Sequence, residues 1–244
     1  MLEGLKRWFG GAAPAPAAGA AAPSLAAWAE ARQYSFRVVR ESGGFVIDGR
    51  LGALPWRLEW GPSQRAYVGG SELRLRAELG LGNDLQVVVL DRPLQEAMEK
   101  TVFDQYVEGV QTRIDNQTPP EMRWLVMFPK LTGSEMGALR QRFAALSSIK
   151  TFLQQWLQGP LTTALQAAPL VAGKPMVLMI SRGRLSLRTA MADPDSADIE
   201  AWLRLFETAM REARRVASQG ADPGAPSTQP SLWAPGTAAD DRKG

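Results

Sequence analysis

Residues 72–79 read ELRLRAEL, and apolar and charged residues alternate along this stretch without a break. Leucine or alanine occupies positions 73, 75, 77 and 79, whereas arginine or glutamate occupies positions 74, 76 and 78. Successive side chains of a β-strand point to opposite faces of its sheet, so this alternation predicts a strand with one buried and one solvated face. A sheet that is solvated on one face is typical of antiparallel pairing.

Further β-rich segments lie on both sides of this strand. They span residues 34–40, 44–49, 54–60 and 85–90. The connections read ESGG, RLGA, GPSQ, GGS and GLGND, and each contains the Gly, Asn, Asp or Pro residues that favour turns. Because short connections favour antiparallel pairing, we expect residues 34–90 to form a β-meander.

Three amphipathic helices are expected around this meander. The first covers residues 24–32 and is capped by Ser24, and the second covers residues 92–115 and is capped by Asp91. The third covers residues 196–218. Its apolar residues recur on one side of the helix, as expected for a helix that covers a sheet: Ile199, Trp202, Leu203, Phe206, Met210, Ala213 and Val216.

The remaining elements lie between the second and third helices. Residues 123–130, RWLVMFPK, are expected to form a buried strand, and residues 134–168 a helical stretch broken near Ser147 and at Gly159–Pro160. A basic hairpin follows at residues 174–191. Because the helices gather after the meander, the expected fold class is α+β, an antiparallel β-meander sheet covered by amphipathic helices, with flexible N- and C-terminal arms.

The chain divides by composition into four parts. Residues 1–9 form a short amphipathic segment, and residues 10–23, GGAAPAPAAGAAAP, form a linker that cannot build a core. Residues 24–218 form the α+β core domain. Residues 219–244 are rich in Pro, Gly, Ala, Ser and Asp and are expected to be a disordered tail.

The first segment carries apolar residues on one side of a short helix. A helix of fewer than about 12 residues is marginal in water, so this segment would order only on a partner. We expect a groove on an unidentified protein rather than a membrane surface, because only Lys6 and Arg7 are basic. The alternative is a frayed terminus. The candidate partner-binding residues are Leu2, Leu5, Trp8 and Phe9.

The composition excludes several classes of site. The chain has no His and no Cys, which excludes zinc, haem and iron–sulfur sites built on those residues, catalytic triads that need an imidazole, and disulfides. We therefore expect no cofactor, no metal site and no catalytic residue. Arg outnumbers Lys 22 to 6, which together with abundant Ala suggests a bacterial source.

Location and charge give weaker indications. No stretch of about 18 consecutive apolar residues is present, and the Ala-rich run makes a poor signal peptide, so a cytoplasmic location is expected. The formal net charge is +3, so the overall basicity is a faint argument for a nucleic acid or another anionic partner.

Arginines mark a candidate anion-binding surface. If the predicted strands lie side by side, their solvated faces would form an arginine-rich sheet face, and Trp56 or Trp60 could stack on a ring. Glutamates are interleaved with these arginines, and cross-strand Arg–Glu pairs are also common on ordinary sheets. The candidate residues are Arg57, Arg74, Arg76, Arg184 and Arg188.

Three functions follow from these features. The favoured one is a non-enzymatic interaction or adaptor protein, whose core is tethered to the partner-binding N-terminal segment. The first alternative is an anion- or nucleotide-binding regulatory domain that uses the arginine-rich face. The second is an enzyme that uses carboxylates and Mg²⁺, for which Asp104 and Glu108, four residues apart on a helix, are the nearest candidates.

Overall fold

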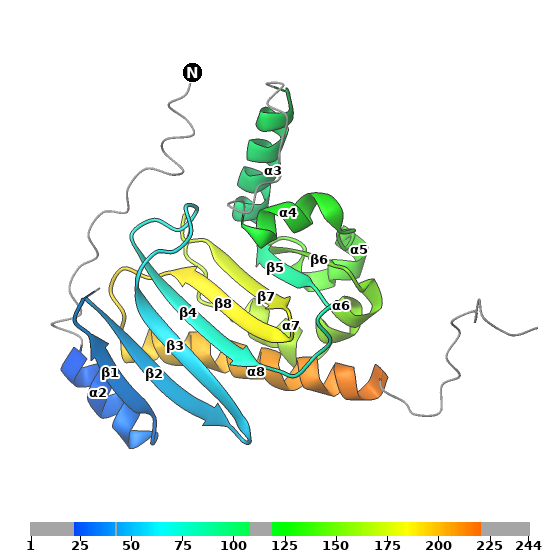
Figure 1. Ribbon diagram of the computed structural model, residues 1–244. Helices are drawn as coiled ribbons and strands as arrows, with labels where there is room; N and C mark the ends of the chain where they lie inside the picture. Colours follow the sequence, from blue (N-terminus) through cyan, green and yellow to red (C-terminus); the bar gives the residue numbers. More distant parts are fainter. Residues whose placement is uncertain (1–21, 42, 108–118, 221–244) are drawn as a thin grey trace, which may run out of the picture.

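The computed structural model describes residues 22–41, 43–107 and 119–220 (Figure 1). These residues form an α+β fold around one 8-stranded sheet, whose strands follow the order β1-β2-β3-β4-β8-β7-β5-β6. Each neighbouring pair is antiparallel. The strands are β1 (Ser35–Val39), β2 (Gly44–Leu51), β3 (Leu54–Pro62), β4 (Ser71–Glu78), β5 (Val87–Asp91), β6 (Phe143–Ser147), β7 (Met176–Ser181) and β8 (Arg184–Ala190).

The predicted meander is correct for its first four strands and wrong for the fifth. Strands β1 to β4 pair in sequence, but β4 then pairs with β8, and β5 lies between β7 and β6. All five residues of β5 are buried. A strand with apolar side chains on both faces is most stable where both faces are covered, so β5 occupies the interior of the sheet rather than the open flank of β4.

Helices cover the two faces of the sheet unequally. One face packs against α2, α6, α7 and α8 in a large hydrophobic cluster, and α8 runs across this face in Figure 1. The other face is covered by α3 and α4 over β5, β6 and β7. The helices are α2 (Ala22–Ala31), α3 (Arg92–Val107), α4 (Pro120–Met127), α5 (Gly133–Met136), the 3-10 helix η1 (Gly137–Leu139), α6 (Lys150–Trp156), α7 (Pro160–Gln166) and α8 (Ser196–Gly220).

The three predicted amphipathic helices are present with shifted boundaries. Helix α2 begins at Ala22, two residues before the predicted cap at Ser24, so the last two residues of the predicted linker are helical. Helix α8 ends at Gly220, and each of its seven predicted apolar positions is buried. Asp91 caps α3 as predicted, because its Oδ1 accepts a hydrogen bond from the Leu94 amide at 3.0 Å. Residues 108–115 of the predicted second helix lie outside the described residues.

The predicted strand at residues 123–130 is wrong, because residues 120–127 form helix α4. Two signals favour the helix: Pro120 lies at its first position, where a proline needs no hydrogen-bond donor, and Glu121 lies in its first turn, near the positive end of the helix dipole. A short apolar run has no periodicity of its own that distinguishes a strand from a helix. Packing against the apolar face of β5, β6 and β7 therefore decides that this run forms a helix.

The predicted helical stretch at residues 134–168 is wrong in its middle. Residues 143–147 form β6, an edge strand whose five residues are all buried. Alanine and leucine in this strand favour a helix locally, but the strand pairs with β5 and its two faces are buried in the two hydrophobic clusters. The predicted break at Gly159–Pro160 is correct, since it separates α6 from α7.

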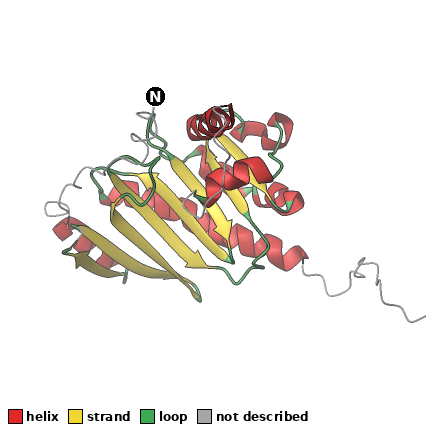
Figure 2. Cartoon of the chain, turned by 45° about the horizontal axis from the view of Figure 1, so that its top comes forward, coloured by secondary structure: helices red, strands yellow, loops and turns green. Residues whose placement is uncertain are grey.

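The alternation within β4 is confirmed by the structure. Leu73, Leu75 and Ala77 are at most 4% exposed and belong to the large cluster. Arg74 and Arg76 point to the opposite face, beyond the part covered by α3 and α4. Figure 2 shows the sheet from a second direction, with helices gathered near one end on this side. The arginine-bearing part of the sheet is thus left beside a helical wall.

Candidate functional site

The strand register brings the predicted arginines together. In β4 and β8, Arg74 lies directly opposite Arg188, and Arg184 lies opposite Glu78. Arg76 lies between Arg57 of β3 and Ser186 of β8. The sequence could only predict that these strands are solvated on one face, and the β4–β8 pairing makes that face continuous.

Glutamates pair with most of these arginines. Glu72 is fully buried and accepts a hydrogen bond from Arg188 Nη1 at 2.8 Å and another from Arg74 Nη1 at 3.3 Å. Glu59 lies 2.8 Å from Arg76 Nη2 and 3.5 Å from Arg74 Nε. The arginine-rich face is therefore a network of mixed charge, as the interleaved glutamates predicted.

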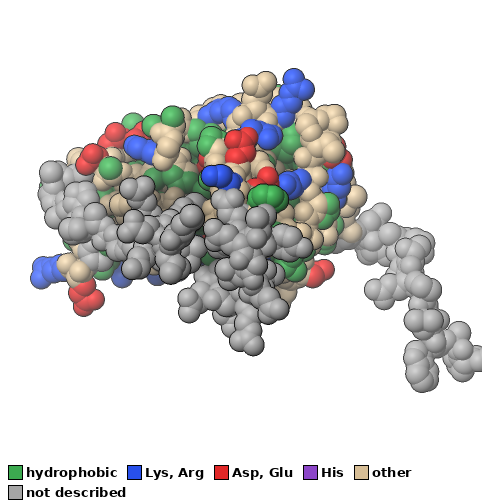
Figure 3. All heavy atoms as spheres, turned by 90° about the horizontal axis from the view of Figure 1, so that it is seen from above, with side chains coloured by type: hydrophobic (Ala, Val, Ile, Leu, Met, Phe, Trp, Pro, Cys, Tyr) green, Lys and Arg blue, Asp and Glu red, His purple; other side chains and the backbone are tan. Residues whose placement is uncertain are grey.

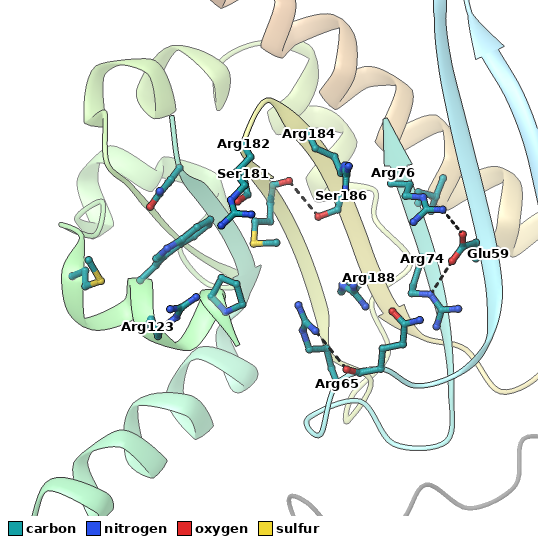
Figure 4. Close-up of a pocket in the computed structure, with 17 residues that line it drawn as sticks. Glu59, Arg65, Arg74, Arg76, Arg123, Ser181, Arg182, Arg184, Ser186 and Arg188 are labelled. Atoms are coloured by element: carbon teal, nitrogen blue, oxygen red, sulfur yellow. Dashed lines mark hydrogen bonds and ion pairs between the residues drawn. The ribbon is translucent and has the colours of Figure 1, made fainter. Parts of the chain in front are cut away.

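The face forms one wall of an open hollow of about 680 Å³, a volume within the usual range of small-molecule sites. Figure 4 shows arginines entering the hollow from several elements. Its other walls come from α4, from the turn between β7 and β8, and from the start of the β3–β4 connection. The charged and hydroxyl residues that line it are Glu59, Arg65, Arg74, Arg76, Arg123, Ser181, Arg182, Arg184, Ser186 and Arg188.

The β3–β4 connection is fastened to α4 by a buried carboxylate. Glu121 is 0% exposed, and its Oε1 accepts a hydrogen bond from Arg65 Nε at 2.7 Å and another from the Tyr67 hydroxyl. Burial raises the pKa of Tyr67 well above its ordinary value, and the negative charge of Glu121 raises it further. Tyr67 therefore remains a hydrogen-bond donor at neutral pH, which holds this wall of the hollow in place.

Two arginines of the hollow have no carboxylate partner. Arg123 on α4 and Arg182 in the β7–β8 turn form no side-chain hydrogen bond or ion pair with any residue that the structure describes. The Nε atom of Arg123 is buried without a hydrogen-bond partner, a costly arrangement for a charged group. Neither residue was among the predicted anion-binding residues.

The backbone at Arg182 is unusual for a residue with a side chain. Arg182 and Gly183 form the two-residue turn of the hairpin, and their φ angles are +52° and +73°. Turns with positive φ at both central positions match the twist of a hairpin, but arginine is disfavoured there relative to Asn or Gly. The turn places this unpaired guanidinium at the rim of the hollow (Figure 4).

The charges around the hollow do not balance. Seven arginines line it, whereas the glutamates that pair with them are Glu59, Glu72, Glu78 and Glu121. Among the residues that the structure describes, the local surplus is therefore three positive charges. On the side of the molecule shown in Figure 3, basic side chains are interspersed with acidic and apolar ones, so the surface is not uniformly basic. A local surplus within a hollow favours a small anion over an extended polyanion.

Only some of the residues predicted to bind an anion line the hollow. Arg74, Arg76, Arg184 and Arg188 line the hollow, but Arg57 does not and instead donates a 2.6 Å hydrogen bond to Asp48. The stacking role predicted for Trp56 or Trp60 is wrong, because both rings are 2% exposed and lie on the core face of the sheet. The alternation that places Arg57 and Glu59 on the solvated face already excludes these two residues from it.

Among the described residues that line the hollow, the aromatic one is Trp124 on α4, and no pattern in the sequence indicated this position. Leu2, Leu5, Trp8 and Phe9 lie outside the described residues, so partner binding by the N-terminal segment stays a prediction. Glu108 also lies outside them. Across the ranges that the structure describes, no three acidic side chains converge in a way that could hold a metal ion.

None of the described helices is both long enough and apolar enough to cross a membrane.

No protein-family model matches the chain, and no curated protein matches it by sequence. Among solved structures, the chain is similar to the crystal structure of the mycobacterial trehalose monomycolate transport factor A, TtfA, with 11% sequence identity and a TM-score of 0.45. The match covers 78% of this chain and 92% of that one. At this level of similarity the likeness says nothing about ligand or activity, which belong to sites rather than to folds.

Proposed function

We propose that the protein is a binding domain for small oxyanions, such as phosphate or carboxylate groups, and that the hollow is its binding site. The observation that carries this proposal is the pair of unpartnered arginines, Arg123 and Arg182, on different walls of the hollow. Guanidinium groups bind carboxylate and phosphate oxygens through two parallel hydrogen bonds. An anion held between these two side chains would provide the partners that the protein does not.

The paired arginines alone would not support this function. Arg74, Arg76, Arg184 and Arg188 each have a glutamate partner, and such pairs are common on the solvated faces of sheets. They contribute a favourable potential, because the side chains of Arg74 and Arg188 are only 14% and 17% exposed and are therefore weakly screened by salt. The two unpaired residues supply the direct contacts.

Anion binding is tested by titrating inorganic phosphate into the full chain at low ionic strength and measuring the heat of binding. Arg123→Gln and Arg182→Gln are each expected to weaken binding about tenfold or more, because each removes a charge-assisted hydrogen bond worth about 1.5–3 kcal/mol. Arg214→Gln is the matched control. Arg214 is exposed on α8, which covers the opposite face of the sheet, and its replacement removes the same charge.

The expected pattern is a large loss of affinity for both hollow variants and no loss for Arg214→Gln, with no loss of thermal stability in any of the three. An equal loss of affinity in all three variants would show that the effect comes from net charge and not from the hollow. Absence of phosphate binding by the unmodified chain would overturn the proposed function.

A further inference from the structure

The hollow has an apolar side as well as a cationic one. Pro120, Trp124 and Met127 line it from α4, and Met179 lines it from β7. Met127 is 62% exposed and Val126 beside it is 65% exposed, so the last turn of α4 presents apolar side chains to solvent, and of these two only Met127 lines the hollow. An inorganic anion bound to the arginines would leave this apolar wall in contact with water.

The apolar and cationic sides of the hollow arise from the outward-facing residues of different strands. Outward residues of β4 and β8 are arginine, glutamate and serine, apart from Ala190, whereas those of β7 are Val177, Met179 and, at its end, Ser181. Helix α4 packs over the apolar strands, and its first turn is joined through Glu121 and Arg65 to the connection between β3 and β4. The hollow therefore lies along the boundary between an apolar and a cationic surface, and both surfaces are within reach of one small molecule.

We propose that the natural ligand is an anionic amphiphile, a molecule with an oxyanion head group and a flexible aliphatic body. The head group lies among Arg123, Arg182 and the arginines of β4 and β8, and the body lies along Met127 and Pro120. This inference rests on the proposed function and specifies its ligand. Methionine suits an aliphatic chain, because its unbranched thioether adapts to a flexible partner.

A nucleotide is a poorer fit to the same walls. Recognition of a base by stacking needs an exposed aromatic face, and Trp124, the aromatic residue on the wall formed by α4, is only 6% exposed. The exposed part of the apolar wall is the Met127 side chain instead. It offers apolar contact without the directional demands of ring stacking.

The inference is tested by calorimetric titration of the full chain with four probes. These are octyl phosphate below its micellar concentration, inorganic phosphate, the uncharged octyl glucoside and adenosine monophosphate. Octyl phosphate is expected to bind at least about tenfold more tightly than inorganic phosphate, because several methylene groups leave water on binding. It is also expected to bind more tightly than adenosine monophosphate, and octyl glucoside is expected to bind weakly.

Met127→Gln and Val171→Gln form a matched pair of variants. Both side chains are more than half exposed, so neither change should affect thermal unfolding, but only Met127 lines the hollow. Met127→Gln is expected to weaken octyl phosphate binding about threefold to tenfold and to leave inorganic phosphate binding unchanged. Val171→Gln is expected to change the binding of neither probe.

Several results would overturn the inference while leaving the proposed function intact. These are equal affinity for octyl phosphate and inorganic phosphate, tighter binding of adenosine monophosphate than of octyl phosphate, or octyl phosphate binding that Met127→Gln does not weaken. Equal binding of octyl glucoside and octyl phosphate would also overturn it, because the head group would then contribute nothing. Binding of none of the anionic probes would instead overturn the proposed function, and this inference with it.

Discussion

At the scale of single residues, the hollow combines features that cost stability. Arg123 keeps a buried Nε without a partner, and Arg182 adopts a backbone conformation that favours Gly or Asn. Strained and unsatisfied groups persist where they serve a function, and here both lie in the same hollow. Stability and binding should therefore oppose each other at these positions.

Arg182→Asn tests this opposition. Asparagine tolerates positive φ and, with Gly183, forms a favoured hairpin turn, so we expect the free energy of unfolding to increase by up to about 1 kcal/mol. The same variant is expected to lose phosphate affinity, because the guanidinium is gone. Chemical denaturation and calorimetry on one sample measure both effects, and a variant that is less stable than the unmodified chain would contradict the argument from backbone strain.

At the scale of secondary-structure elements, α5 is joined to α6 by charge and capping. Thr132 and Glu135 form a capping box at the start of α5, and Glu135 also lies 2.7 Å from Lys150 Nζ in the first turn of α6. The hydrogen bond with Lys150, followed by that from the Thr132 amide, lowers the pKa of Glu135 to about 2. The ionised carboxylate is thus the form that connects these two short helices.

Glu135→Gln is expected to change how stability depends on pH. The pKa of Glu135 is lower in the folded than in the unfolded chain, so its contribution is fully present above the ordinary value of about 4.5. The contribution is then lost as the pH falls toward 2. Denaturation curves of the unmodified chain and the variant should differ most above pH 5 and converge near pH 2. A constant difference across this range would show that the charge of Glu135 does not matter.

At the scale of the whole molecule, the two faces of the sheet have separate roles. One face and its helices hold the large cluster, and the other carries the hollow. The residues of both hydrophobic clusters lie between Leu25 and Val216.

Removal of residues 1–21 and 221–244 should therefore leave both folding and anion binding intact. We expect cooperative thermal unfolding with a midpoint within a few degrees of that of the full chain, because every core residue that the structure describes is kept. Phosphate affinity should also be unchanged. Loss of anion binding in the shortened chain would show that a terminal segment contributes to the site, and loss of cooperative unfolding would show that it contributes to the core.

The sequence by itself determined the features that depend on the spacing of apolar residues along a single strand or helix. The alternation in residues 72–79 placed Leu73 and Leu75 in the core and Arg74 and Arg76 on the other face, and the stripe of α8 was read correctly. These predictions hold because the periods of strands and helices fix which neighbouring residues share a face. Four arginines of the hollow could be named for the same reason.

Only the tertiary structure decided which distant elements lie side by side. Short apolar runs such as residues 123–130 and 143–147 can form either a helix or a strand, and burial against the rest of the molecule selects between them. Local period says nothing about the partner of β4, nor about the position of α4. The unpaired Arg123 and Arg182 line the same hollow because long-range burial sets the β4–β8 pairing and the position of α4, and no pattern in either segment alone reveals it.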